Sequence, residues 1–206
     1  GAIRAPWHPD SMAVRSAARA TTVQRLNPPT CIKGVAPFRA KDLSEIMSCF
    51  CAGEYAGWLR DALICYKNGD ARYVELLSQV LYNTLDKFLG FKNLTLIPIP
   101  SSNQKIKERG FDSVTNLCSN MIQRNKSIAM DETNLFLRRI VLDQVGLTAA
   151  QRHSNLEGAF GIRRTVNGTV VLVVDVVTTG ATLKSAARTL KLAGAQRVFA
   201  LKLCGS

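Results

Sequence analysis

The stretch from Thr169 to Thr182 joins an apolar strand pattern to groups that can hold an anion. The apolar run is followed by Asp175 and then by a short loop that contains Thr178, Thr179, Gly180 and Thr182. A helical pattern begins at once, and backbone N–H groups at a helix N-terminus favour a bound anion. Threonine hydroxyls add donors, and Gly180 lets the backbone approach closely. The pattern predicts a monophosphate cradle, with Asp175 at its rim to accept hydrogen bonds from neighbouring hydroxyls.

The strand that carries Asp175 is predicted to be central in a parallel sheet. Residues 169–174 (TVVLVV) show no alternation of apolar and polar residues, which indicates burial on both faces. Further strands are expected at 94–100, 135–137 and 197–203, and helices at 112–123 and 183–193. Because strands alternate with helices, we expect an α/β fold, a parallel sheet flanked by helices, over residues 92–206. In such sheets ligands bind at the carboxyl ends of the strands.

The rest of the chain has a different character. Residues 1–40 contain five prolines, six basic residues and one acid, and read as an irregular basic N-terminal arm. Residues 41–91 show helical spacing, which predicts a mainly helical front piece. Within it, Trp58 shares a helical spacing with Ala62 and Cys65, so a core position is expected for Trp58. Residues 139–158 are polar and long for a passive connection, which favours a lid over a ligand.

Composition narrows the classes of function. The net charge of +12 and the pI of 9.8 predict attraction to nucleic acid, phosphorylated metabolites or an acidic membrane surface. Six cysteines without a CxxC pair argue against a zinc site and fit a reducing, cytoplasmic compartment. The sequence has no apolar run of about 18 residues and no evident signal peptide. With two histidines in all, a Ser-His-Asp or Cys-His set is not expected.

The strand, acid and threonine loop resemble the phosphoribosyl pyrophosphate motif of type I phosphoribosyltransferases, which has two acids before the loop. Three further segments resemble the ComF family, in family order: EYAGWLRDALICYKNGD (54–70), PIPSSNQKIKERGFDSV (98–114) and QVGLTAAQRHSNLEGAF (144–160). The four blocks cover roughly residues 50–204. The resemblance implies a ComF-type protein with a type I phosphoribosyltransferase-like sheet. In bacteria this family is associated with uptake of transforming DNA, that is, with competence.

The resemblance also implies roles for individual residues. The 5′-phosphate would be held by the threonine loop: Thr178, Thr179, Gly180, Ala181 and Thr182. Asp175 would bind the ribose hydroxyls and, through a bound water, Mg2+. Pyrophosphate would lie on the turn after the strand at 94–100, held by Ser101, Ser102, Lys105 and Arg109. Asp175 and Arg109 are the catalytic candidates, and Gln144 and Arg152 would reach over the ligand from the flexible loop. The alternative for the cations of this turn is a solvated basic surface.

The sequence departs from the family pattern at three places. Val174 replaces the first acid, which removes one or two charged hydrogen bonds, each worth roughly 1.5–3 kcal/mol. Asp112-Ser113 replaces the Asn-Gln pair that follows Arg-Gly-Phe. Of the four cysteines of the family's N-terminal zinc ribbon, Cys31 alone has a counterpart here.

Two classes of function therefore remain open. In the first, the chain binds phosphoribosyl pyrophosphate or a nucleotide 5′-phosphate and either transfers the phosphoribosyl group, releasing pyrophosphate, or retains binding alone. In the second, it is a non-catalytic accessory protein that binds single-stranded DNA on the same fold, as its charge suggests. A purine-salvage or amido-transferring enzyme of the same superfamily agrees less well with the ComF-like segments.

Overall fold

The structure, a computed structural model, describes residue 46 and residues 48–87, 93–138, 158–177 and 180–205. Within these ranges a five-stranded sheet is formed by β1 (Ser48–Glu54), β2 (Leu94–Pro98), β3 (Ile128–Met130), β6 (Thr169–Val177) and β7 (Arg197–Gly205). The helices are α2 (Gly57–Lys67), α3 (Tyr73–Asp86), α4 (Asn103–Arg109), α5 (Ser113–Arg124) and α7 (Ala181–Leu192). A separate antiparallel pair is formed by β4 (Leu135–Leu137) and β5 (Phe160–Ile162).

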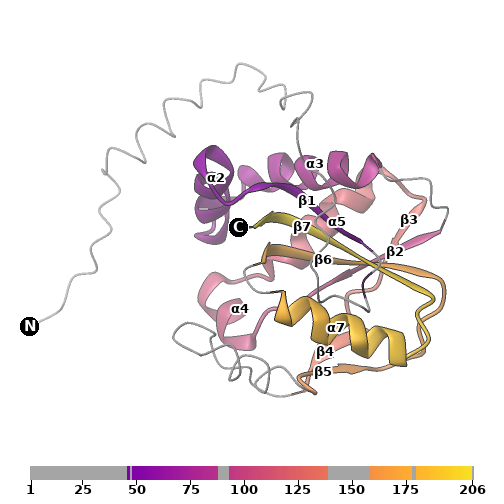
Figure 1. Cartoon of the computed structure of the whole chain (residues 1–206). Coiled ribbons are helices and arrows are strands. Elements are labelled where there is room, and N and C mark those ends of the chain that lie inside the picture. The colour runs from indigo at the N-terminus through magenta and orange to yellow at the C-terminus, as the bar shows by residue number, and fades with distance from the viewer. Residues whose placement is uncertain (1–45, 47, 88–92, 139–157, 178–179, 206) are drawn as a thin grey trace, which may run out of the picture. The chain divides into compact units, whose positions relative to one another are not determined.

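The strand order in the main sheet is β1–β7–β6–β2–β3, and every neighbouring pair is parallel (Figure 1). β6 is therefore central, as its unbroken apolar run predicts, and Leu172 and Val173 are fully buried within it. Burial of one such side chain contributes about 1.5–3 kcal/mol. The expected fold class, an α/β parallel sheet flanked by helices, is confirmed.

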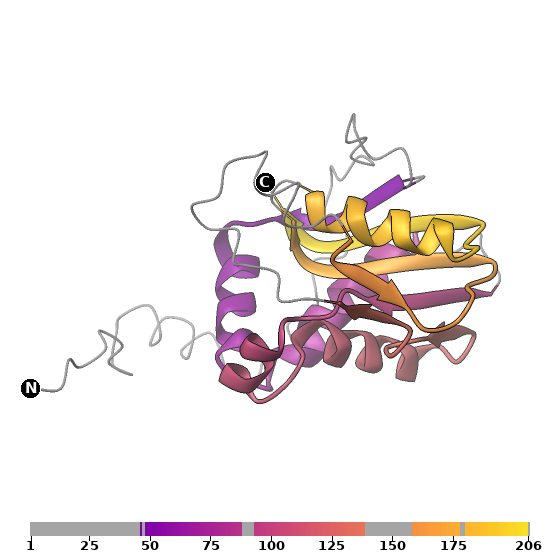
Figure 2. The same ribbon diagram turned by 90° about the horizontal axis from the view of Figure 1, so that it is seen from below.

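Helices cover the two faces of this sheet (Figures 1 and 2). One face packs against α2, α3 and α5, where Leu63, Leu81 and Leu117 are among the buried side chains. The other face packs against α7 and the β4–β5 pair, through residues such as Leu183 and Phe160. Each helix on this sheet thus buries an apolar stripe, which is the usual reason that amphipathic helices dock on a strand layer.

Several expectations need correction. Residues 48–54 lie in the predicted helical piece but form β1, which pairs along β7 because its residues are apolar on both faces. β6 continues two residues beyond Asp175. Trp58 is 45% exposed rather than in the core, because the buried stripe of α2 runs through Leu59, Ala62, Leu63 and Tyr66 instead. The helix α4 and the strands β3 and β5 were not expected from the sequence.

The remaining elements agree with the predictions to within a few residues. The helix expected at 112–123 is α5, and Asp112 caps it by accepting from the N–H groups of Val114 and Thr115. The strand expected at 135–137 is β4. The N-terminal arm (1–40) and most of the expected lid (139–158) lie outside the described residues. Among the described helices, none combines the length and the apolar character needed to cross a membrane.

Candidate ligand-binding site at the ends of β2 and β6

The chain reverses its direction across the sheet between β2 and β6. From β2 it passes through α4 and α5 to β3 on one side, and from β6 it passes through α7 to β7 on the other. The two crossover helices α5 and α7 consequently lie on opposite faces. Such a reversal leaves a crevice outside the carboxyl ends of the two strands, where open α/β sheets bind their ligands. The sequence-predicted turn 100–103 and the segment that begins at Asp175 both lie at this edge.

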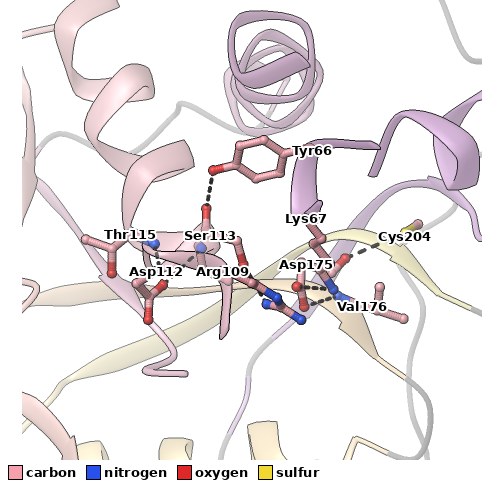
Figure 3. Close-up of polar contacts among 10 residues, drawn as sticks. Tyr66, Lys67, Arg109, Asp112, Ser113, Thr115, Asp175, Val176 and Cys204 are labelled. Atoms are coloured by element: carbon pink, nitrogen blue, oxygen red, sulfur yellow. Dashed lines mark hydrogen bonds and ion pairs between the residues drawn. The ribbon is translucent and has the colours of Figure 1, made fainter. Parts of the chain in front are cut away.

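Asp175 forms an ion pair with Lys67, the last residue of α2. The Lys67 Nζ lies 2.5 Å from the Asp175 Oδ2, and the two side chains are 23% and 17% exposed (Figure 3). The other carboxylate oxygen, Oδ1, accepts a hydrogen bond of 2.7 Å from the N–H of Val176. Both oxygens of the predicted ribose-binding carboxylate are therefore engaged by the protein itself.

Arg109 lies next to this pair. It ends α4, and the left-handed Gly110 (φ 82°) turns the chain away immediately afterwards. A cavity of about 480 Å³ is lined by Ile64, Lys67, Asn68, Glu108 and Arg109. Its two cationic side chains, Lys67 and Arg109, come from different helices. The Arg109 guanidinium makes a long hydrogen bond of 3.5 Å to the Ser113 Oγ, so most of its donors are not used by that contact.

Asp112 fixes the segment that carries Arg109. Its Oδ2 accepts from the N–H of Ser101 at 3.0 Å, and its Oδ1 accepts from the first turn of α5. One carboxylate thus ties the end of β2 to the start of α5. Asp112 thus has a structural role here, because an aspartate is one of the preferred N-cap residues.

Tyr66 supports the same segment from α2. Its side chain is 1% exposed, and its hydroxyl donates to the Ser113 carbonyl at 2.8 Å (Figure 3). The centroid of its ring lies 5.3 Å from that of the Phe111 ring. Burial raises the pKa of Tyr66 well above its usual range, and the hydrogen bond to Asn116 opposes that shift. The hydroxyl is therefore a neutral donor at ordinary pH. Through Tyr66 and Lys67, the end of α2 contacts both sides of the crevice.

The described part of the predicted phosphate cradle lies at the start of α7. Gly180 has a left-handed conformation (φ 73°), which glycine adopts without strain, and α7 begins at the next residue, Ala181. Thr182 lies in the first turn of the helix and is half-buried. Thr178 and Thr179 lie outside the described residues, as do the lid candidates Gln144 and Arg152.

The pyrophosphate candidates other than Arg109 have varied surroundings. Ser101 is tied to Asp112 through its backbone, whereas the Ser102 Oγ accepts from the N–H of Lys105 at 3.4 Å and caps α4. The hydroxyl of Ser102 therefore has a structural task in this structure. Ser101, Ser102, Lys105 and Arg109 are all half-buried rather than fully solvated.

A second lysine lies near the end of β6. Lys202 on β7 is 4% exposed and pairs in register with Val174. The Lys202 Nζ lies close to Gly205, because a Cβ atom added to that glycine would be 2.5 Å from the Nζ. Gly205 pairs with Val177, the last residue of β6. Val174 and Lys202 lie on the face covered by α7, whereas Asp175 and Lys67 lie on the opposite face.

The thiol of Cys204 completes the surroundings of Asp175. Its Sγ lies 3.7 Å from the Asp175 carbonyl oxygen and donates to it. Burial, and next the charge of Asp175, raise the pKa of Cys204 to about 12. The thiol is protonated at neutral pH, and it is therefore a poor nucleophile.

Three of these residues were missed as site residues from the sequence: Lys67, Tyr66 and Lys202. Lys67 had a signal, because it stands in one of the ComF-like segments directly before the Asn-Gly-Asp turn. Lys202 had a weaker signal, as the one charge in the interior of an apolar strand that begins at Arg197. The place of Tyr66 depends on packing between α2 and the 111–113 segment, which no local pattern shows.

The expected Mg2+ does not fit the described residues well. The Asp175 Oδ2 faces the Lys67 ammonium group and Oδ1 faces a backbone N–H. In the described part of the chain, no group of three or more His, Cys, Asp or Glu side chains is placed to hold a metal ion. Mg2+ favours several oxygen ligands.

Comparisons with known proteins add little. No family model and no curated protein matches the chain. Two crystal structures of hypoxanthine phosphoribosyltransferase from Staphylococcus aureus, in tetragonal and orthorhombic space groups, are similar with TM-scores of 0.40 and 0.41. Their sequences are 16% and 17% identical to this one, and the match covers 65% of this chain. It spans 63% of each of those chains, slightly less than two thirds.

Proposed function

We propose that this chain binds phosphoribosyl pyrophosphate, or a nucleotide 5′-phosphate, in the crevice at the ends of β2 and β6. One observation carries the proposal: three groups lie at the same edge of the sheet. They are Asp175, the Gly180 turn into α7, and Arg109, which lines the cavity. Each group suits a different part of the ligand. The resemblance of the Thr178–Thr182 loop to the phosphoribosyl pyrophosphate motif supports the same assignment.

In this proposal the start of α7 and its threonine loop hold the 5′-phosphate, because N–H groups and hydroxyls there donate to its oxygens. Asp175 accepts hydrogen bonds from the ribose hydroxyls once Lys67 has moved aside. Arg109 contacts the pyrophosphate group, for which a guanidinium supplies paired donors. The sugar thus lies across the end of β6, between its two phosphorylated ends.

The proposed reaction is transfer of the phosphoribosyl group. The bond between C1 of the ribose and the pyrophosphate oxygen breaks, and pyrophosphate leaves with the electron pair. A nucleophilic nitrogen of the acceptor forms the new bond to C1 and gives up its proton. This step needs positioning and stabilisation of the departing charge rather than a nucleophilic side chain. The proposed context, by the ComF resemblance, is uptake of DNA.

Calorimetric titration with phosphoribosyl pyrophosphate in the presence of Mg2+ tests the binding proposal. Wild-type protein should bind, and Thr179→Ala should weaken binding about tenfold or more, as expected for loss of a hydrogen bond to a charged group. The matched control is Thr189→Ala, because the Thr189 hydroxyl donates to the Ser185 carbonyl near the far end of α7. The absence of binding to folded wild-type protein would rule out the proposal.

A second candidate function is binding of single-stranded DNA. It is favoured by two exposed aromatic side chains, Tyr55 and Trp58, which are 41% and 45% exposed near the end of β1. Exposed aromatic rings can stack on bases, at about 1–3 kcal/mol per base. A titration with a fluorescent oligonucleotide separates the two functions: Trp58→Ala should weaken DNA binding while leaving phosphoribosyl pyrophosphate binding unchanged.

A further inference from the structure

The two layers that cover the main sheet differ in charge. The helices α2, α3 and α5 together contain three basic and three acidic residues, so they add no net charge to their layer. The other layer is formed by α7 and the β4–β5 pair, and α7 contains three basic residues and no acid. The segments 131–138 and 158–164, which include β4 and β5, add three arginines and two acids. Positive charge is therefore concentrated in the layer of α7 and the β4–β5 pair.

Two exposed arginines of this layer lie beside Phe136 and Gly161, which pair in register between β4 and β5. The guanidinium carbon of Arg163 lies 4.8 Å from the centroid of the Phe136 ring. A Cβ atom added to Gly161 would lie 2.5 Å from the Phe136 Cζ and 2.7 Å from the Arg138 Nε. The glycine therefore leaves the room in which the ring and the Arg138 side chain lie across the strand.

The charges of Arg138 and Arg163 are not cancelled by a carboxylate in the described part of the chain. The Arg163 Nε donates to a backbone carbonyl at 3.0 Å, which orients the guanidinium but leaves its charge. The layer contains two acids, and one of them, Asp131, pairs with Arg164 at 3.3 Å. The other is Glu132, which is exposed in the turn before β4. One free carboxylate thus stands against the remaining basic residues of the layer.

The basic residues of α7 extend this charge. Lys184, Arg188 and Lys191 are four and three residues apart, so they lie on one side of the helix on successive turns. Arg188 is exposed, and Lys184 is half-buried. The Lys191 Nζ donates to the Gln196 carbonyl at 2.7 Å, a contact that does not cancel its charge. Because α7 packs against β5, the helix and the two strands form one continuous layer (Figures 1 and 2).

This arrangement matches a row of phosphate groups. Arginines and lysines without acidic partners are the groups that contact nucleic-acid backbones, and such contacts do not depend on base sequence. Proteins that bind single strands also present aromatic rings on which bases stack. The Phe136 ring is half-buried and has the Arg163 guanidinium over it, so it is a poor stacking platform. The layer therefore suits the backbone of a duplex better than a single strand.

We propose that the layer of α7 and the β4–β5 pair binds the phosphate backbone of double-stranded nucleic acid without regard to base sequence. The phosphate contacts come from four side chains: Arg138, Arg163, Lys184 and Arg188. None of the four lines the cavity beside Arg109, so the inference goes beyond the proposed function and does not depend on it. It also differs from the single-strand candidate, which uses Tyr55 and Trp58.

The test is fluorescence anisotropy with a short labelled DNA duplex and the full chain, repeated over a range of salt concentrations. The double variant Arg163→Gln with Arg188→Gln should bind about tenfold or more weakly, and its slope of log affinity against log salt should be smaller by about two. Arg163→Lys keeps the charge and should bind within about threefold of the wild type. The matched control is Arg124→Gln with Lys126→Gln, which removes the same charge from exposed positions at the end of α5 and before β3.

The comparison of the double variant with its control decides the outcome, because residues 1–40 are also basic and add to binding by every variant. Equal binding of the duplex by the two would overturn the inference, and so would failure of the wild type to bind it at low salt. Tighter binding of a single strand of the same length would overturn the assignment to a duplex. Circular dichroism shows that each variant is folded, and both should bind phosphoribosyl pyrophosphate as the wild type does. Loss of that binding in all proteins alike would contradict the proposed function and leave this inference standing.

Discussion

The Lys67 Nζ lies 2.5 Å from the Asp175 Oδ2, and this contact joins the end of α2 to the carboxyl end of the central strand. The pair spans 108 residues of sequence by its numbering (175 − 67) and lies where the chain reverses across the sheet. In the proposed function the pair separates when the ligand binds, because Asp175 then accepts hydrogen bonds from the ribose hydroxyls.

The ion pair should make a modest contribution to stability. Both side chains are about one-fifth exposed, so solvent screens their attraction and the coupling energy should be about 1 kcal/mol. A double-mutant cycle of Lys67→Gln and Asp175→Asn, measured by urea unfolding, checks this value. Effects of the two substitutions that simply add would show that the contact does not stabilise the fold.

Asp175→Asn should weaken phosphoribosyl pyrophosphate binding about 10- to 100-fold, because an amide is a weaker acceptor than a carboxylate for the ribose hydroxyls. Isothermal titration at fixed pH measures the change. The control is Glu75→Gln, since Glu75 pairs with Arg124 at 3.3 Å on the surface of α3 and α5. A loss of equal size in the control would assign the effect to general charge rather than to Asp175.

Arg109→Gln should reduce the affinity for inorganic pyrophosphate about tenfold, because the guanidinium offers paired donors to an anion and the amide does not. Within the described part of the chain the guanidinium makes one long hydrogen bond, to Ser113, so the substitution should change the unfolding midpoint little. Competition of pyrophosphate against a labelled nucleotide measures the affinity. Arg124→Gln is the matched control. If Arg109→Gln binds pyrophosphate as tightly as the wild-type protein does, the assignment is contradicted.

Stability should fall in alkaline solution through buried thiols. The pKa of Cys204 rises from 9.0 to about 12 on folding, so its proton is bound more tightly in the folded state. The contribution is complete below pH 9.0 and declines as the pH rises from there toward 12. Over this window the titration of Cys204 should raise the equilibrium constant for unfolding about tenfold per pH unit. Chemical unfolding of Cys204→Ser should show a flatter alkaline decline, and an unchanged pH profile would contradict this assignment.

The sequence predicts the central parts of this fold well, because they obey local rules. The unbroken apolar run of β6 indicates a strand buried on both faces, and Asp112 is a recognisable helix cap. The threonine loop after Asp175 points to an anion site at the carboxyl end of β6, and that site stays a prediction. The expected helix pattern fails at β1, because a short apolar run fits either a helix or a buried strand.

The parts that the sequence does not predict depend on contacts between distant segments. Trp58 and Ala62 share a helical spacing, yet Trp58 is exposed because the sheet contacts the neighbouring stripe of α2. The pairing of Lys67 with Asp175 follows from where α2 ends over the sheet, and that position is set by packing around Tyr66. The place of Lys202 opposite Val174 is a matter of strand register, which the two local sequences do not contain.

The most direct test of the central claim is a crystal structure of the protein with phosphoribosyl pyrophosphate bound. The account predicts the 5′-phosphate at the start of α7, the ribose hydroxyls on Asp175, the pyrophosphate near Arg109, and Lys67 turned away from Asp175. A ligand bound elsewhere, with the Lys67–Asp175 contact intact, would contradict the account.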